Sequence, residues 1–371
     1  MTTNGSTPSS IKVDNERPKS KDSIATTTSN NTISTTAATV STSAVTASSH
    51  NSNGRSNSSS NSSTNNNKSN GHSNLKHSRS TSIWIFPESV VLNHTPSRIQ
   101  AKMTLSQELR VKESIHEFII RLGTKLKLDG PTLLATTVYL HRFYMRLPLS
   151  SSKYFVASAA IAISCKLNDT YRQPDKVSLY ACNVKNPNPP VIKNNIKHAP
   201  PPIDEQSEYF WKWRDQLLYR EELILRTLCF DLSFTSPYLL QFKILNKIHL
   251  GMGQLFYSKR KDILKMTIVL IELLSSLPIV LCYDMKEIFT TCFVITIVEG
   301  KSKLDKELKI PENFMSQVIG VDVDVALHCF RFIKKLLYCS QEDSRFISNK
   351  GAAKRLLPIK SQLFEDVARG K

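Results

Sequence analysis

The sequence predicts an all-α protein with two consecutive groups of about five helices, preceded by a polar tail that we expect to be disordered. From residue 83 onward, apolar residues recur at the three- and four-residue spacing of helices, and alternating strand patterns are scarce. Before residue 83, 50 of the 82 residues are Ser, Thr or Asn, and the first aromatic residue is Trp84. A segment of that composition cannot bury enough apolar surface to offset the entropy of ordering it.

Changes in composition along the 371 residues set the expected boundaries. The formal net charge of +18 divides into +5 in the tail and +13 in the remainder. The remainder is long enough for two domains of ordinary size. We expect a tail over 1–82, a first helix group with an entry segment over 83–234, a second group over 235–340, and a C-terminal extension over 341–371 that is too sparse in apolar residues to assign.

The first two predicted helices are recognised by different signals, an apolar face in one and flanking prolines in the other. The earliest has its apolar side chains at helical spacing, and the next has Pro131 in its first turn and Pro148 after its end. The apolar face of the earliest helix consists of Ile115, Phe118, Ile119, Leu122 and Leu126. The body of the next helix is expected at Leu133–Arg146.

The segment Phe155–Leu167 is different, because small and apolar residues surround it on every side until Lys166. A helix without a polar face is buried all round, and its Ala and Ser residues let neighbouring helices come close. We therefore predict that this helix is the centre of the first group.

The remaining elements follow in order. Six prolines fall within the segment 185–203, so we expect a long surface loop without regular structure there. A very short linker around Ser236 and Pro237 separates the two groups. The predicted helices are Asp175–Val184 and Glu205–Leu228 in the first group and about 238–250, 254–276, 284–299 and 313–339 in the second.

Several classes of protein are disfavoured by the sequence. The longest apolar run, Met266–Leu274, is interrupted by Glu272 and falls short of the roughly 20 residues that span a bilayer. The N-terminus has no apolar stretch of the secretory-signal type. The seven cysteines include no CxxC pair, which argues against a zinc ribbon, and most lie in apolar stretches; we expect no metal site. We therefore expect a reduced, intracellular protein that contacts no membrane.

No catalytic motif is found in the sequence. A glycine-rich phosphate loop, GxSxG, HExxH and the kinase signature residues are all missing. His141, on a predicted helix, is interpreted as a core residue with a satisfied hydrogen bond rather than a ligand. We expect no catalytic residues and no cofactor, so the chain is not predicted to be an enzyme.

Two charged residues fall on apolar helix faces. Lys166 follows Ile163 by three residues on the buried helix, and Glu221 lies between Leu217 and Leu225 on the next long helix. A lone charge in such a position is costly unless it is paired. Either each side chain reaches water at the edge of the core, or the two pair with each other or with charges on a partner.

Several segments together resemble the cyclin box, and in particular the transcription cyclins of the T and K types and the Bur kinase cyclins of yeasts. The resemblance covers about 83–340; the first repeat matches by motif and the second by helix count and spacing alone. The matching segments are Trp84–Phe86, Thr95–Arg98, Thr132–Met145 (TLLATTVYLHRFYM), Ile163–Leu167 (ISCKL) and Glu221–Phe234 (EELILRTLCFDLSF).

This resemblance implies two five-helix cyclin-box repeats and a non-catalytic regulatory subunit. The implied partner is a cyclin-dependent protein kinase catalytic subunit, with RNA polymerase II and elongation factors as indirect partners and a nuclear location. The family's kinase-contacting pair corresponds to Lys166 and Glu221. The neighbouring apolar contacts correspond to Leu167, Leu225, Phe230 and Leu232.

The sequence departs from the family at two places. Asn168-Asp169 follows the lysine where an acidic pair is usual, and Leu109–Lys112 stands where cell-cycle cyclins carry a substrate-docking motif. Substrate docking through that groove is therefore not expected.

The sequence leaves two other classes of function as alternatives. A cyclin-fold general transcription factor that binds DNA directly would account for the charge of +13. The absent zinc ribbon and the implied kinase-contact residues argue against it, and many basic residues, as in Lys259–Lys261, are typical of solvated helix faces. An enzyme would need convergent polar groups, which the sequence does not offer.

Overall fold

The computed structural model describes most of the chain beyond the polar tail. The expectation of disorder for residues 1–82 lies outside the described residues, apart from Ser82 itself. The described residues are 82–150, 152–185, 191–193, 196–198, 201–303, 306–341 and 347–370.

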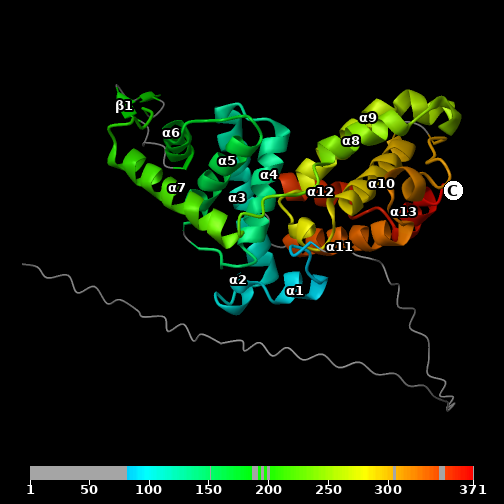
Figure 1. Ribbon diagram of the computed structural model, residues 1–371, viewed down its shortest axis with the longest axis horizontal. Helices are drawn as coiled ribbons and strands as arrows, with labels where there is room; N and C mark the ends of the chain where they lie inside the picture. The colour runs from blue at the N-terminus through cyan, green and yellow to red at the C-terminus, as the bar shows by residue number, and fades with distance from the viewer. Residues whose placement is uncertain are drawn as a thin grey trace, which may run out of the picture. The chain divides into compact units, whose positions relative to one another are not determined.

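The first helix group is built around one buried helix, as predicted (Figure 1). Every residue from Val156 to Cys165 is buried, because the helix α5 packs against four neighbours, α3, α4, α6 and α7. The group consists of α3 (Leu105–Leu126), α4 (Gly130–Phe143), α5 (Lys153–Leu167), α6 (Pro174–Lys185) and α7 (Glu208–Thr227), preceded by α1 (Glu88–Asn93) and α2 (Pro96–Ile99).

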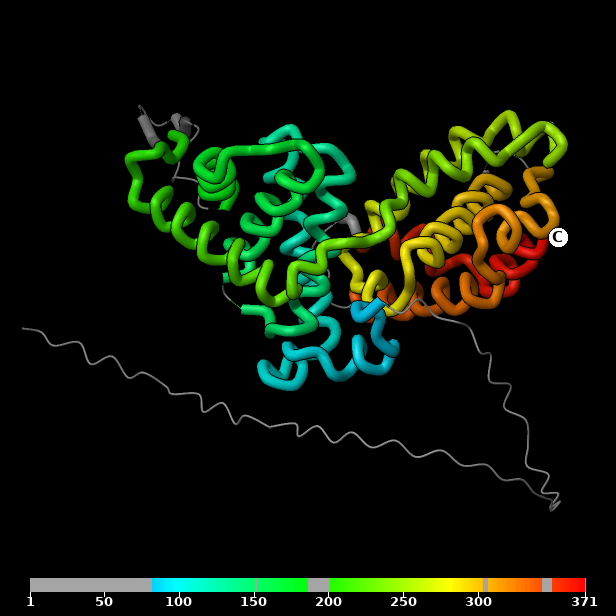
Figure 2. The backbone as a smooth tube through the Cα atoms, viewed as in Figure 1, coloured from blue at the N-terminus to red at the C-terminus, as the bar shows by residue number. Residues whose placement is uncertain are grey.

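The second group repeats this arrangement around α10 (Met285–Lys303). Side chains such as Phe293 and Ile295 are fully buried, because α8, α9, α11 and α13 pack around this helix. Figure 2 traces the connection from α7 to α8 that links the two groups. The other helices are α8 (Pro237–Lys247), α9 (Gln254–Leu274), α11 (Val323–Gln341), α12 (Ile347–Leu356) and α13 (Ser361–Ala368), with short turns at Leu250–Met252, Pro278–Leu281 and Phe314–Ile319.

The prediction of an all-α fold is confirmed, but two local predictions are wrong. A continuous helix over 313–339 is broken, because Gly320 adopts φ +82, a left-handed conformation that ends the π-helical turn Phe314–Ile319 before α11 begins. The segment expected to lack regular structure contains a two-stranded antiparallel hairpin, β1 (Val191–Lys193) and β2 (Ile196–His198). Between Pro190 and Pro200 there is no proline, so backbone donors are available for this pairing.

The C-terminal extension is helical and belongs to the second group. Phe364 of α13 is fully buried and stacks on Phe330 of α11, with ring centroids 4.4 Å apart and planes 6° apart. Asn349 of α12 is also buried; its Oδ1 accepts a hydrogen bond from the Ser276 hydroxyl. Among the described helices none is long and apolar enough to cross a membrane.

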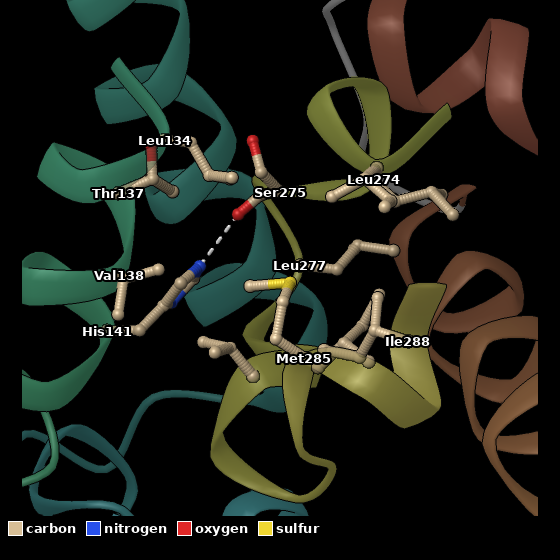
Figure 3. A pocket seen from close by; sticks show the side chains of 12 residues that line it. Leu134, Thr137, Val138, His141, Leu274, Ser275, Leu277, Met285 and Ile288 are labelled. Carbon is tan, nitrogen blue, oxygen red and sulfur yellow. Dashed lines mark hydrogen bonds between the residues drawn. The ribbon is translucent and has the colours of Figure 1, made fainter. Parts of the chain in front are cut away.

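Two buried histidines join the groups at the end of α9. His141 Nε2 lies 2.8 Å from the Ser275 carbonyl oxygen (Figure 3). His116 Nε2 lies 2.9 Å from the Ser275 hydroxyl. A carbonyl only accepts, so His141 carries its proton on Nε2. The Ser275 hydroxyl donates to the Glu272 carbonyl, so His116 also donates through Nε2. The interpretation of His141 as a satisfied core residue is confirmed.

These histidines predict a loss of stability in mild acid. Burial lowers the pKa of His116 from 6.5 to about 4, and burial with the nearby charge of Lys112 lowers the pKa of His141 to about 3. The folded state therefore favours the neutral rings, and its stability is complete above pH 6.5 and falls as pH drops toward those values. Between pH 7 and pH 5 we expect a loss of about 2 kcal/mol per histidine.

Urea unfolding of the full chain across this pH range measures that loss. In a His141→Gln variant, the difference in unfolding free energy between pH 7 and pH 5 should shrink by roughly half. A wild-type curve that is flat over this range would contradict the assignment of both rings as neutral and buried.

Candidate functional site

Lys166 and Glu221 form an ion pair with each other, which is one of the alternatives that the sequence left open. Lys166 lies in the last turn of α5 and its Nζ contacts Oε1 of Glu221 in the middle of α7. The lysine side chain is 45% exposed and the glutamate 12%. Such a partly exposed pair contributes about 0–1 kcal/mol to folding. The pair therefore contributes little to the stability of the fold, and its main effect is to hold two charges in fixed positions near the surface.

Of the four apolar side chains in the predicted site, two are largely exposed. Leu167 is 52% exposed and Phe230 is 69% exposed, while Leu225 and Leu232 are partly buried against the core. Each exposed side chain forfeits part of the roughly 1.5–3 kcal/mol that full burial would contribute. Clustered exposure of this kind is typical of a surface that another protein covers.

A groove of about 410 Å³ connects part of this cluster to the second group. It brings together three of the predicted site residues, Leu167, Phe230 and Leu232, with Tyr238 at the start of α8. Lys166, Glu221 and Leu225 lie outside the lining of the groove. The described site therefore has two parts, a charged pair and an apolar groove beside it.

The backbone that presents Phe230 is an unusual turn at the end of α7. Cys229 and Phe230 have φ angles of 51° and 58°, in the left-handed region that residues with a side chain rarely adopt. The Phe230 N–H donates to the Leu225 carbonyl and the Leu232 N–H donates to the Phe230 carbonyl. These bonds end the helix and direct the phenyl ring outward.

Two residues that the site prediction did not include hold this turn. The Trp84 indole N–H donates to the Asp231 carboxylate at 2.9 Å. Arg142 of α4 donates to the carbonyl oxygens of Asp231 and Ser233 at 3.2 and 2.8 Å. The hydroxyl of Ser233, the Trp84 indole and the Arg142 charge together lower the pKa of Asp231. Both residues lie in segments that carry the sequence resemblance, but nothing in the sequence brings them to Asp231.

The first helix group matches a known protein family. Residues 87–233 match the family described as cyclin, N-terminal domain. The match spans α1 to α7 and the turn at Phe230, so the chain contains a cyclin N-terminal domain.

Relatives of this domain include cyclins of several named types. The chain is 33% identical to Cyclin pch1 of Schizosaccharomyces pombe over 162 residues, which cover 43% of this chain and 44% of that cyclin. It is 25% identical to Cyclin-T1-5 of Arabidopsis thaliana over 170 residues, covering 45% and 28%. It is 24% identical to human Cyclin-K over 169 residues, covering 45% and 25%. The chain thus spans less than half the length of these relatives, and the similarity to T- and K-type cyclins is confirmed.

Proposed function

We propose that this chain is the regulatory subunit of a cyclin-dependent kinase that acts in transcription elongation by RNA polymerase II. The observation that carries the proposal is the Lys166–Glu221 pair flanked by the exposed side chains of Leu167 and Phe230. A fixed charge pair beside uncovered apolar residues suits a partner helix that brings both backbone polar groups and an apolar face. The similarity to Cyclin pch1 and to the T- and K-type cyclins supports this choice of partner.

The proposed mechanism is a shift in the population of kinase conformations. The subunit contributes no catalytic group; it makes better contacts with the active position of the kinase's regulatory helix than with the inactive one. A ligand that prefers one of two states moves the equilibrium toward that state in proportion to its preference. In the active state the regulatory-helix glutamate pairs with the lysine that holds the ATP phosphates, a pairing that kinases require. The substrates would be the polymerase C-terminal repeats and elongation factors, phosphorylated in the nucleus.

Several arginine side chains are bonded within the fold, which weakens the case for direct DNA binding that the net charge makes. Arg172 donates to four backbone carbonyls, including those of Leu126 and Lys127 at the end of α3. Arg355 forms two hydrogen bonds to Glu299, and Arg142 holds the turn at Asp231. These guanidinium groups serve the fold, which reduces the number that could contact phosphates.

Affinity purification of the full chain from nuclear extract tests the proposal. We expect one cyclin-dependent kinase catalytic subunit to co-purify in equimolar amount and to phosphorylate a peptide of polymerase C-terminal repeats. The kinase expressed alone should be nearly inactive on the same peptide. Retention on DNA that falls steeply with salt, with no kinase bound, would instead favour the DNA-binding alternative.

A further inference from the structure

The position of the exposed Phe230 ring depends on the backbone around it and not on burial of the ring. The side chain is 69% exposed, so packing contributes little to its position. Two consecutive left-handed residues, Cys229 and Phe230, are unfavourable on their own. Such a conformation persists only where the surrounding structure determines it. The next residue, Asp231, makes several of the contacts that hold this conformation.

Four hydrogen bonds hold Asp231 and Ser233, which follow Phe230 in the chain. The Asp231 carboxylate accepts from the Trp84 indole on one oxygen and from the Ser233 hydroxyl, at 2.7 Å, on the other. Arg142 bridges the carbonyl oxygens of Asp231 and Ser233 with its two terminal nitrogens. Arg142 is 5% exposed, so its two bonds are partly shielded from water, as is the Trp84–Asp231 bond, whereas the Ser233–Asp231 bond is exposed.

Trp84 is itself anchored from several directions. The indole is 2% exposed, and the guanidinium carbons of Arg142 and Arg146 each lie 5.4 Å from its ring centroid. Two residues later, the Phe86 N–H donates to the Leu281 carbonyl of the second group at 2.7 Å. The entry segment, residues 82–86, therefore crosses between the two groups and holds Asp231 as it does so.

We propose that the Trp84–Asp231 contact is a clamp through which the entry segment sets the position of Phe230 for the partner kinase. Trp84 is then a positioning residue: it acts on kinase affinity through the turn at Asp231 and does not contact the kinase. This inference rests on the proposed function, because Phe230 must be part of the docking surface. It makes the segment immediately before the cyclin domain necessary for tight kinase binding.

Trp84→Phe tests the clamp, because it keeps an aromatic ring and removes the N–H donor. We expect the full-length variant to bind the kinase that co-purifies with the wild-type chain about tenfold more weakly, as one lost hydrogen bond to a carboxylate implies. Trp211→Phe makes the same change at a more exposed position away from the site: this indole is 49% exposed, and 14 residues of α7 place it about 21 Å from Leu225. Its affinity should stay within about twofold of wild type.

A double-mutant cycle separates positioning from general stability. If Trp84 acts through Phe230, then Trp84→Phe should weaken binding no further in a Phe230→Ala background. Backbone hydrogen exchange at Leu232 should be faster in Trp84→Phe even without kinase. Because the indole is 2% exposed, the smaller ring also lowers the melting temperature, so exchange and binding are compared at a temperature where both chains are fully folded. Wild-type affinity and wild-type exchange in Trp84→Phe would overturn the clamp while leaving the docking site intact. Failure of the wild-type chain to bind any kinase, with faster exchange in the variant, would overturn the proposed function alone.

Discussion

Replacing Lys166 with glutamate is expected to weaken kinase binding by at least about 100-fold and to abolish kinase activation. The change sets two carboxylates, at 166 and 221, against each other at the centre of the proposed docking surface. A partner helix that matched a cation and an anion would meet two anions, and like charges brought together at an interface cost several kcal/mol. The chain itself should remain folded, because the Lys166 side chain is 45% exposed.

Titration of the purified kinase with wild-type and variant chains measures this effect. Lys265→Glu is a suitable control, since it makes the same change at an exposed position of α9 in the second group. The paired exchange Lys166→Glu with Glu221→Lys should restore the internal ion pair and still leave kinase binding weak, because the partner then meets each charge in the wrong place. A Lys166→Glu chain that co-purified with fully active kinase would show that the docking surface lies elsewhere.

The core of the first group and its charged pair could be predicted from the sequence for physical reasons. Phe155–Leu167 has no polar face, and a helix of that kind can only be central. Lys166 and Glu221 stood out because each interrupts an apolar stripe, although that pattern alone left open whether the two pair or each reaches water. The charge sum of +18 was less informative, because this pair cancels in it.

The clamp at Asp231 could not be predicted in the same way. Trp84 and Asp231 are 147 residues apart, and neither interrupts a pattern. Their contact depends on the path of the entry segment between the two groups. The spacing of residues in the sequence does not predict that path. The left-handed residues Cys229 and Phe230 were equally hidden, because neither is a glycine and their conformation is imposed by tertiary contacts.

The C-terminal helices were missed because they are short. α12 and α13 have 10 and 8 residues, and isolated helices of that length are marginal in water. Their stability comes from packing against the second group, so propensity and periodicity gave only a weak signal. Phe364 is the side chain through which α13 makes that packing.

Phe364→Ala is therefore expected to lower the unfolding free energy by about 3–5 kcal/mol. The side chain is fully buried and stacks on Phe330, so its removal leaves a cavity between α13 and α11 that rigid helices fill only in part. Equilibrium unfolding of the full chain in urea measures the change. Leu363→Ala, at the adjacent position, is the control: that side chain is 46% exposed and should cost less than about 1 kcal/mol.

This variant also separates stability from docking. The proposed site lies on α5, α7 and the turn at Phe230, whereas Phe364 packs in the second group. Below the unfolding transition, the folded fraction of Phe364→Ala should bind the kinase with wild-type affinity. An early transition confined to the second group would give two unfolding steps in place of one. If Phe364→Ala unfolded at the wild-type urea concentration, α13 would not be a structural part of the second group, and the five-helix arrangement around α10 would be wrong.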